Sequence, residues 1–167
     1  MRAVSALLQA GQFRAAHERL EAIAEANPTF VEALRLLAGT KLALGDARAA
    51  EALLRRALEL DPGWTATYTT LGELLLASGR GGEAETLLQR ALGGTRPDPR
   101  AALLLTRYYN DTGRSAQALA VAAPFCASGR LDPELATQHV AALIALGRQA
   151  EALAFYGQLA GAAPDSP

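Results

Sequence analysis

The chain has 167 residues, 50% of them hydrophobic and 20% charged, which is enough apolar material for a buried core and excludes an intrinsically disordered chain. No apolar run approaches the roughly 18 residues that a membrane-spanning helix needs, so we expect no membrane partner. The 16 Lys and Arg residues and 17 Asp and Glu residues give a net charge of −1, without the basic surplus typical of nucleic-acid-binding proteins.

The first predicted element is a short amphipathic helix at the N-terminus. Val4, Leu7 and Leu8 fall on one stripe of this helix, which ends before Gly11. The apolar run is too short and too interrupted for the core of a signal peptide. We therefore interpret these residues as part of the fold and expect a cytoplasmic protein, with a periplasmic location left open if a leader is missing.

A repeat of 34 residues organises the whole chain. Its marker is a glycine that is followed five residues later by an alanine. The glycines are Gly11, Gly45, Gly79, Gly113 and Gly147, and the alanines are Ala16, Ala50, Ala84, Ala118 and Ala152. Three prolines, Pro28, Pro62 and Pro164, follow three of the glycines by 17 residues. Chance does not keep such a register, so we infer five copies of one structural unit.

Each repeat is predicted to be a pair of helices. Helical periodicity precedes the glycine, as in Leu34 and Leu37, and resumes after it, as in Ala50 and Leu54. Glycine is favoured just past a helix end because it reaches the left-handed conformation without a Cβ clash. Small residues also stand seven positions before each glycine, and these are Val4, Ala38, Gly72, Thr106 and Val140. We expect these small residues to face the repeated alanine, which would let the paired helices approach each other closely.

The fourth repeat departs from this pattern in its second half. Ala122 stands where the other repeats have a large residue, and Phe125 stands where the second and third repeats have Ala57 and Ala91. Pro124 falls inside the predicted second helix and should kink or end it, because proline lacks the N–H that would bond to the preceding turn. Asp98-Pro99 and Asp132-Pro133 each predict a helix start, with the aspartate as N-cap and the proline in the first turn.

These features together resemble the tetratricopeptide repeat family over essentially the whole chain. The second repeat matches with Leu34, Leu37, Ala38, Gly45, Ala50, Leu54, Ala57 and Pro62, and the third with Tyr68, Leu71, Gly72, Leu75, Gly79, Ala84, Leu88 and Ala91. The resemblance implies an all-α fold, a right-handed α-solenoid of about five antiparallel helix pairs. We expect one domain over 1–167, with repeats at about 1–30, 31–64, 65–98, 99–132 and 133–164, the first of them truncated.

The same resemblance implies that the first helix of each repeat lines a concave groove that binds a peptide or a helix. The candidate groove residues are Arg35, Thr69, Glu73, Arg100, Leu103, Arg107, Asn110 and Thr137. Arg100 and Arg107 suit an acidic group, because the guanidinium fork matches a carboxylate. The alternative, weighted slightly higher, is that Arg107 pairs with Glu73 one repeat away. Tyr108 is a candidate peptide anchor, whereas Tyr109 occupies a core position.

No catalytic or metal-binding constellation is found in the sequence. His17 is expected on a solvated outer face, and His139 is expected to be a semi-buried packing residue. Cys126 has no base nearby in the sequence, so we interpret it as a small buried hydrophobe and not as a nucleophile. Nucleophile-elbow, phosphate-loop and HExxH motifs are absent. We expect no enzymatic activity, no metal and no cofactor.

The favoured interpretation is a non-catalytic scaffold whose partner is a protein or peptide held in the groove. The alternative is an interaction domain of a larger enzyme, such as a transferase or an oxygenase. The last predicted helix carries Leu153, Phe155, Tyr156 and Leu159, too many apolar side chains to face water on all sides. Either the chain continues in a longer polypeptide, which we favour, or this end packs against a partner or a second copy. A homo-oligomer through the C-terminal helix therefore stays an open alternative.

Overall fold

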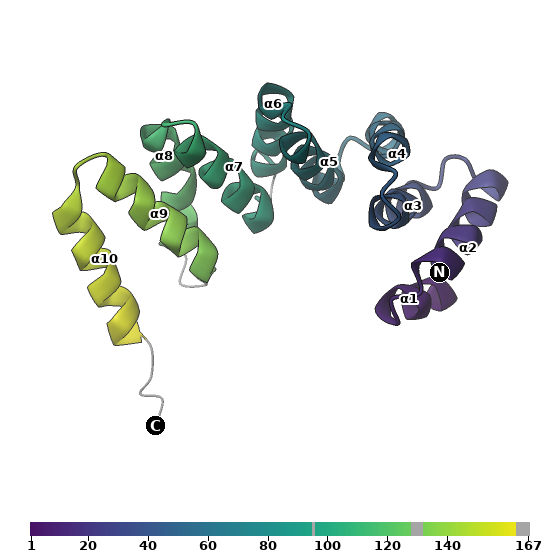
Figure 1. Ribbon diagram of the computed structural model, residues 1–167, viewed down its shortest axis with the longest axis horizontal. Coiled ribbons are helices and arrows are strands. Elements are labelled where there is room, and N and C mark those ends of the chain that lie inside the picture. Colours follow the sequence, from purple (N-terminus) through teal and green to yellow (C-terminus); the bar gives the residue numbers. More distant parts are fainter. Residues whose placement is uncertain (95, 128–131, 163–167) are drawn as a thin grey trace. The chain divides into compact units, whose positions relative to one another are not determined.

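A computed structural model describes the chain except for residues 95, 128–131 and 163–167. Within the described residues every regular element is an α-helix, and no strand is found, which confirms the all-α prediction. In chain order the helices are α1 (Arg2–Gln9), α2 (Phe13–Ala26), α3 (Val31–Ala43), α4 (Ala47–Leu60), α5 (Thr65–Ala77), α6 (Gly81–Leu92), α7 (Pro99–Asp111), α8 (Ser115–Cys126), α9 (Pro133–Ala145) and α10 (Gln149–Ala162) (Figure 1).

The helices form two compact units, an N-terminal unit (Met1–Ala91) and a C-terminal unit (Leu92–Pro167). In the N-terminal unit α3 contacts α2 and α4, and in the C-terminal unit α9 contacts α8 and α10. Neighbouring repeats within one unit thus pack against each other, as in helical repeat proteins generally.

The five repeated glycines adopt the left-handed conformation that the sequence predicts. Their φ angles are 68° at Gly11, 85° at Gly45, 76° at Gly79, 72° at Gly113 and 73° at Gly147. A Cβ atom added at any of these five would meet nothing within 4 Å. The requirement for glycine therefore comes from the positive φ and not from lack of space.

The predicted small residues lie between the paired helices and are buried. Ala16, Ala50, Ala84 and Ala118 are fully buried, and Ala152 is nearly so. In the N-terminal unit, Ala38 and Ala50 share one core cluster with Leu71 and Ala84, so the core continues from one repeat to the next. Thr106 and Val140 are buried at the corresponding positions of the C-terminal unit.

Side-chain caps define the starts of three helices. The Asp98 carboxylate accepts a hydrogen bond from the Arg100 backbone N–H at 2.9 Å, as predicted for the start of α7. Asp132 caps α9 in the same way, accepting from the N–H groups of Glu134 and Leu135 at 2.9 and 3.0 Å. Asp46, which the sequence analysis did not single out, caps α4 by accepting from Ala49 N–H at 3.0 Å.

The prolines mark helix ends. Pro28 and Pro62 directly follow the capping residues of α2 and α4, as predicted, and Pro164 lies outside the described residues. Pro124 lies inside the last turn of α8, which runs on to Cys126 before it ends. The helix therefore continues past the proline by less than one turn. Because proline has no backbone N–H, the hydrogen bond from position 124 to the preceding turn is missing.

An ion-pair cluster joins α4 to α6 on the surface of the N-terminal unit. A Glu51 carboxylate oxygen accepts from the Arg55 and Arg80 guanidinium groups at 2.6 and 2.7 Å. Arg80 also donates to both oxygens of Glu83 at 2.7 Å. Hydrogen bonds from Arg55 and then Arg80 lower the pKa of the Glu51 carboxyl below its usual value of 4.5. The cluster therefore keeps Glu51 ionised to a lower pH than an isolated carboxylate.

Two helical glycines offer a test of the packing. A Cβ at Gly72 would lie 2.8 Å from Leu88, which is fully buried, whereas a Cβ at Gly39 would meet nothing within 4 Å. Gly39→Ala should raise the free energy of unfolding by about 0.5–1 kcal/mol through helix propensity. Gly72→Ala should lower it by about 1 kcal/mol, because overpacking exceeds the same propensity gain. Urea denaturation followed by circular dichroism measures both, and stabilisation by Gly72→Ala would contradict the predicted contact with Leu88.

The ion-pair cluster predicts an acid-dependent loss of stability. Because the pKa of Glu51 is lower in the folded chain than in the unfolded one, its charge stabilises the fold above the usual carboxylate pKa, and this stabilisation is lost as the pH falls. Glu51→Gln should reduce the free energy of unfolding by up to about 1 kcal/mol near pH 7 and by much less near pH 3. Urea denaturation at both pH values checks this. Glu59→Gln, on the same helix in the exposed pair with Arg56, is the control and should show a smaller difference.

Candidate partner-binding faces on the first helices

The predicted site residues lie on α3, α5, α7 and α9, which are the first helices of the second to fifth repeats. The two compact units divide them into two groups. Arg35, Thr69 and Glu73 belong to the N-terminal unit, and Arg100, Leu103, Arg107, Asn110 and Thr137 belong to the C-terminal unit. We call the first group, with Trp64, the N-terminal face, and the second group, with Glu134 and Gln138, the C-terminal face.

Arg35 is the cation of the N-terminal face, and its contacts lie within the fold. Its guanidinium donates to both carboxylate oxygens of Glu32 at 3.1 Å. The same group lies 5.3 Å from the ring centroid of Trp64, the residue that precedes the first turn of α5. An ion pair and a cation–π contact together hold Arg35 in place and offset its charge.

Two of the predicted site residues are largely buried. Thr69 is 4% exposed and Leu103 is 8% exposed. The Thr69 hydroxyl lies 3.4 Å from the Thr65 carbonyl oxygen, and Leu103 joins a core cluster with Ala102 and Leu135. Each side chain therefore offers only a small part of its surface outside the fold.

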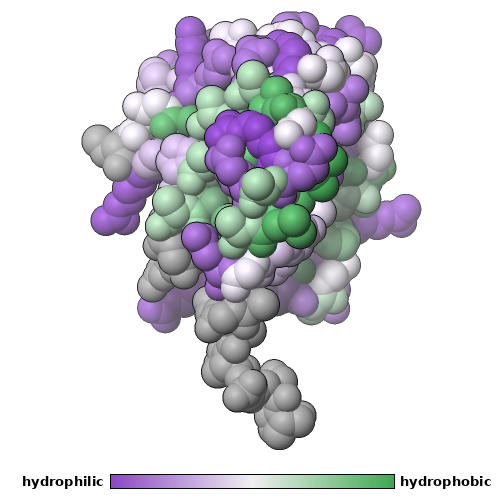
Figure 2. All heavy atoms as spheres, turned by 90° about the vertical axis from the view of Figure 1, so that its left-hand side faces the viewer, coloured by the Kyte–Doolittle hydropathy of each residue, from purple (hydrophilic) through white to green (hydrophobic). Residues whose placement is uncertain are grey.

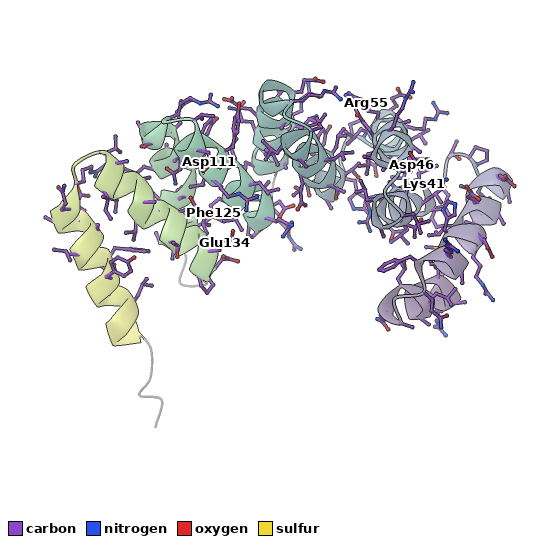
Figure 3. The ribbon with its side chains drawn as sticks, in the orientation of Figure 1. Lys41, Asp46, Arg55, Asp111, Phe125 and Glu134 are labelled. Carbon is purple, nitrogen blue, oxygen red and sulfur yellow. The ribbon has the colours of Figure 1, made fainter. Side chains whose placement is uncertain are left out.

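The C-terminal face presents two arginines on α7. Arg100 and Arg107 are both exposed. Arg107 lies 3.4 Å from Glu134, and the two side chains are 47% and 56% exposed. Glu134 belongs to the first turn of α9 (Figure 3). An ion pair this exposed is worth about 0–1 kcal/mol, so a carboxylate from outside can compete with Glu134 for the guanidinium.

A hydrogen-bonded bridge holds α7 against α9 beside these arginines. The Asn110 amide donates to the Gln138 backbone carbonyl at 2.9 Å and to its side-chain oxygen at 3.0 Å. Thr137, one turn from the start of α9, is exposed and donates its hydroxyl to the Pro133 carbonyl at 2.9 Å. The bridge fixes the spacing between the two helices that carry the face.

Sequence reasoning did not find Gln138 as the partner of Asn110 and did not pair Arg107 with Glu134. Both contacts join the first helices of adjoining repeats, across 28 and 27 residues of sequence. The signal that could have found them is a pair of complementary polar residues separated by slightly less than the 34-residue repeat. Residues one full repeat apart occupy equivalent positions on neighbouring helices. Two residues that touch across these helices are therefore separated by a number of residues different from the repeat length.

The tyrosines of α7 have different environments. Tyr109 is buried, as predicted, and Tyr108 is half-buried. The Arg114 guanidinium lies 4.9 Å from the Tyr108 ring centroid and 4.5 Å from that of Tyr109. A cation–π contact thus already covers part of Tyr108, the residue predicted to be the more open of the two.

The histidines and the cysteine have structural environments. His17 was expected on a solvated face, but its side chain is 15% exposed, with one ring nitrogen 3.3 Å from the Thr40 hydroxyl and the other 3.1 Å from Glu21. Burial raises the pKa of the Cys126 thiol to about 11, which disfavours the nucleophilic thiolate. Among the residues that the structure describes, no group of three or more His, Cys, Asp or Glu side chains could hold a metal ion.

Among the helices in the described part of the chain, none combines the length and the hydrophobicity needed to cross a bilayer.

Comparison with known proteins identifies the repeat. A tetratricopeptide repeat family model matches residues 7–72 and 41–108, and a second model of that description matches residues 99–124. Comparison with curated protein sequences finds no match.

Several solved structures are similar to this chain. MamA is 21% identical, with 97% of this chain and 95% of MamA covered and a TM-score of 0.82. PilF from Pseudomonas aeruginosa is 22% identical, with 99% and 75% covered and a TM-score of 0.83. YrrB, described as a TPR protein with an unusual peptide-binding site, is 16% identical, with 97% and 84% covered and a TM-score of 0.73. At these identities the likeness shows the fold, an all-α helical repeat solenoid.

The bridge and the ion pair of the C-terminal face should contribute unequally to stability. Asn110→Ala removes two hydrogen bonds that join α7 to α9 and should lower the free energy of unfolding by about 1–2 kcal/mol. Arg107→Ala, on the same helix, removes an exposed ion pair and should change it by less than about 0.5 kcal/mol. Chemical denaturation of the two variants makes the comparison, and equal losses would contradict it.

Proposed function

Because this chain belongs to the tetratricopeptide repeat family, we propose that it is a protein-interaction scaffold that binds an acidic peptide segment of a partner on its C-terminal face. Proteins of this family are generally non-catalytic interaction scaffolds. The segment is a peptide or a helix, and it lies along the exposed side of α7 and α9. Recognition uses the side chains that these two helices present and involves no chemical step.

The exposed arginines of α7 carry the proposal. Most of α7 is buried, including Ala101, Leu104 and Tyr109, yet Arg100 and Arg107 are exposed. They are seven residues apart, which places them about two turns and about 10 Å from each other on one side of the helix. Two guanidinium forks at this spacing suit carboxylates about two helical turns apart in a bound segment.

The rigidity of this face supports the proposal further. The buried side of α7 and the Asn110–Gln138 bridge hold the helix before any partner arrives. Little conformational entropy is then lost on binding, because the backbone that carries the arginines is already ordered. Thr137 is exposed on α9, and its hydroxyl oxygen can accept a hydrogen bond from the main chain of a bound segment.

Binding can be tested with random peptides displayed on phage and selected on the immobilised chain. We expect the selected peptides to be enriched in Asp and Glu. The double variant Arg100→Ala/Arg107→Ala should raise their dissociation constants at least about tenfold, because it removes charge-assisted hydrogen bonds. Fluorescence anisotropy measures the constants, and circular dichroism should show unchanged helicity.

Arg56→Ala is the matched control for this experiment. Arg56 is an exposed arginine on α4, paired with Glu59, and it lies outside the C-terminal face. Its replacement should leave the dissociation constants unchanged. Selected peptides without acidic residues, or peptides that bind the double variant as well as the original chain, would overturn the proposed face.

A further inference from the structure

A groove in the C-terminal unit lies apart from the residues that the proposed function uses. It has a volume of about 580 Å³, lies among α8, α9 and α10, and is lined by none of the residues of the C-terminal face. We call it the α8–α10 groove. A hollow of about 340 Å³ lies among α4, α5 and α6 of the N-terminal unit, and its lining shares four repeat positions with that of the groove. These positions hold Arg55 and Ala123, Leu71 and His139, Leu87 and Phe155, and Arg90 and Gln158. The groove is therefore a feature of the repeat, formed by three consecutive helices.

In the N-terminal unit the ion-pair cluster bridges the two helices that border the hollow. Arg80, at the start of α6, donates to Glu83 through Nε and Nη2 and to Glu51 on α4 through Nη1. Glu83 also accepts from Arg55 on α4 at 3.4 Å. Each of the two charges at the start of α6 thus has one partner of opposite charge on its own side and one on α4.

The start of α10 carries the same pair without the partners on the other helix. Arg148 and Glu151 occupy the repeat positions of Arg80 and Glu83 and line the α8–α10 groove. The Nε and Nη2 of Arg148 donate to the two oxygens of Glu151 at 2.6 Å. Among the described residues, the Nη1 of Arg148 has no acidic partner and Glu151 has no second basic partner.

The other half of the cluster is absent because α8 does not supply it. Leu119 stands at the repeat position of Glu51, and Ala123 stands at that of Arg55. The whole of α8 carries no charged residue. The α8–α10 groove therefore holds half of a four-charge cluster that is complete in the N-terminal unit.

The rest of the lining is small, apolar or neutral. The wall on α8 includes Ala116, Ala120 and Ala123, which are exposed and lie on one side of the helix. Side chains this small allow another helix to approach α8 closely. Burial, with the Arg148 charge as a smaller cause, lowers the pKa of His139 below its usual value, so this ring is neutral at pH 7. Figure 2 faces the side of the C-terminal unit that carries α10 and shows apolar surface with hydrophilic residues among it.

We propose that the α8–α10 groove binds a helix of another protein that completes the cluster, with an acidic residue for Arg148 and, one turn away, a basic residue for Glu151. On α4 the same two charges also lie one turn apart, at Glu51 and Arg55, and a hydrogen bond of 2.6 Å joins them. A helix presents two such residues on one side, and apolar side chains beside them can pack on the alanines of α8. A small molecule would stay largely exposed in so open a groove.

This partner differs in chemistry from the acidic segment proposed for the C-terminal face. Its acidic and basic residues bring no net charge, and with Arg148 and Glu151 they make a neutral set of four. The site therefore selects for the order and spacing of two charges beside an apolar stripe, and not for acidity.

Helical peptides displayed on phage test the proposal. The library is an alanine-rich helix with one randomised side, and the target is the full chain with Arg100→Ala/Arg107→Ala, so that peptides bound by the C-terminal face are not selected. We expect an acidic and a basic residue one turn apart, flanked by apolar residues. Because this target lacks the arginines of the C-terminal face, failure of the proposed function would leave the result unchanged.

Two variants of the target locate the bound helix. Ala123→Arg places an arginine at the repeat position of Arg55, where it can pair with Glu151 and block the wall on α8. Arg148→Ala removes the guanidinium that receives the acidic residue. Each should raise the dissociation constants of the selected peptides at least about tenfold, because charge-assisted hydrogen bonds or close packing are lost. Fluorescence anisotropy measures the constants, and circular dichroism shows whether each variant keeps its fold.

Arg56→Ala is the matched control for Arg148→Ala. Arg56 pairs with Glu59 three residues further on, as Arg148 pairs with Glu151, but it lies on α4 and does not line the groove. Its replacement should leave the dissociation constants unchanged.

The histidines supply a readout by NMR. The chain has only His17 and His139, so their ring signals are readily assigned. A selected peptide should shift the signals of His139, which lines the groove, and leave those of His17 on α2 unchanged.

Several outcomes would overturn the proposal. These are a selection that yields no binding peptide, selected peptides without the two charges, peptides that bind either variant as tightly as the target, and His139 signals that do not move. Sedimentation equilibrium of the chain alone covers the remaining occupant. A dimer that Ala123→Arg dissociates would mean that a second copy, and not a helix of another protein, fills the groove.

Discussion

The fold depends on the close packing of the two helices of each repeat, where the small residue of the first helix and the repeated alanine of the second are both buried. The alanines from Ala16 to Ala118 are fully buried, and at Gly72 even a Cβ would meet Leu88 at 2.8 Å. This closeness requires a tight connection between the helices. The positive φ of the repeated glycines supplies that connection. The turn and the contact are therefore two parts of one constraint, which the sequence keeps through five repeats.

The same constraint explains why outer positions are free to vary. Once the small residues hold each pair together, the exposed side of a second helix is not needed for the core. On α4 it carries the cluster of Glu51 and Arg55, whereas on α8 it carries alanines. This freedom lets different repeats present surfaces of different chemistry on one type of scaffold. A repeat protein diversifies its surfaces in this way without changing its core.

The C-terminal unit shows this separation clearly. Its first helices present Arg100, Arg107 and Glu134, which favours recognition by charge. A groove among α8, α9 and α10 lies apart from these charged residues, none of which lines it. The two surfaces lie on different helices of the same unit, α7 and α9 for the first and mainly α8 and α10 for the second.

The helix pairs, the glycine turns, the buried alanines and the starts of α7 and α9 could be predicted from the sequence, because each depends on chemistry within one repeat. The sequence also indicated that the apolar side chains of the last helix, Leu153, Phe155, Tyr156 and Leu159, are too many to face water on all sides. The burial of Leu103 and Thr69, the hydrogen bonds from Asn110 to Gln138, and the place of His139 in the lining of a groove became visible only in the folded chain. Those features depend on the angle and offset between neighbouring helices, which a repeat pattern does not contain.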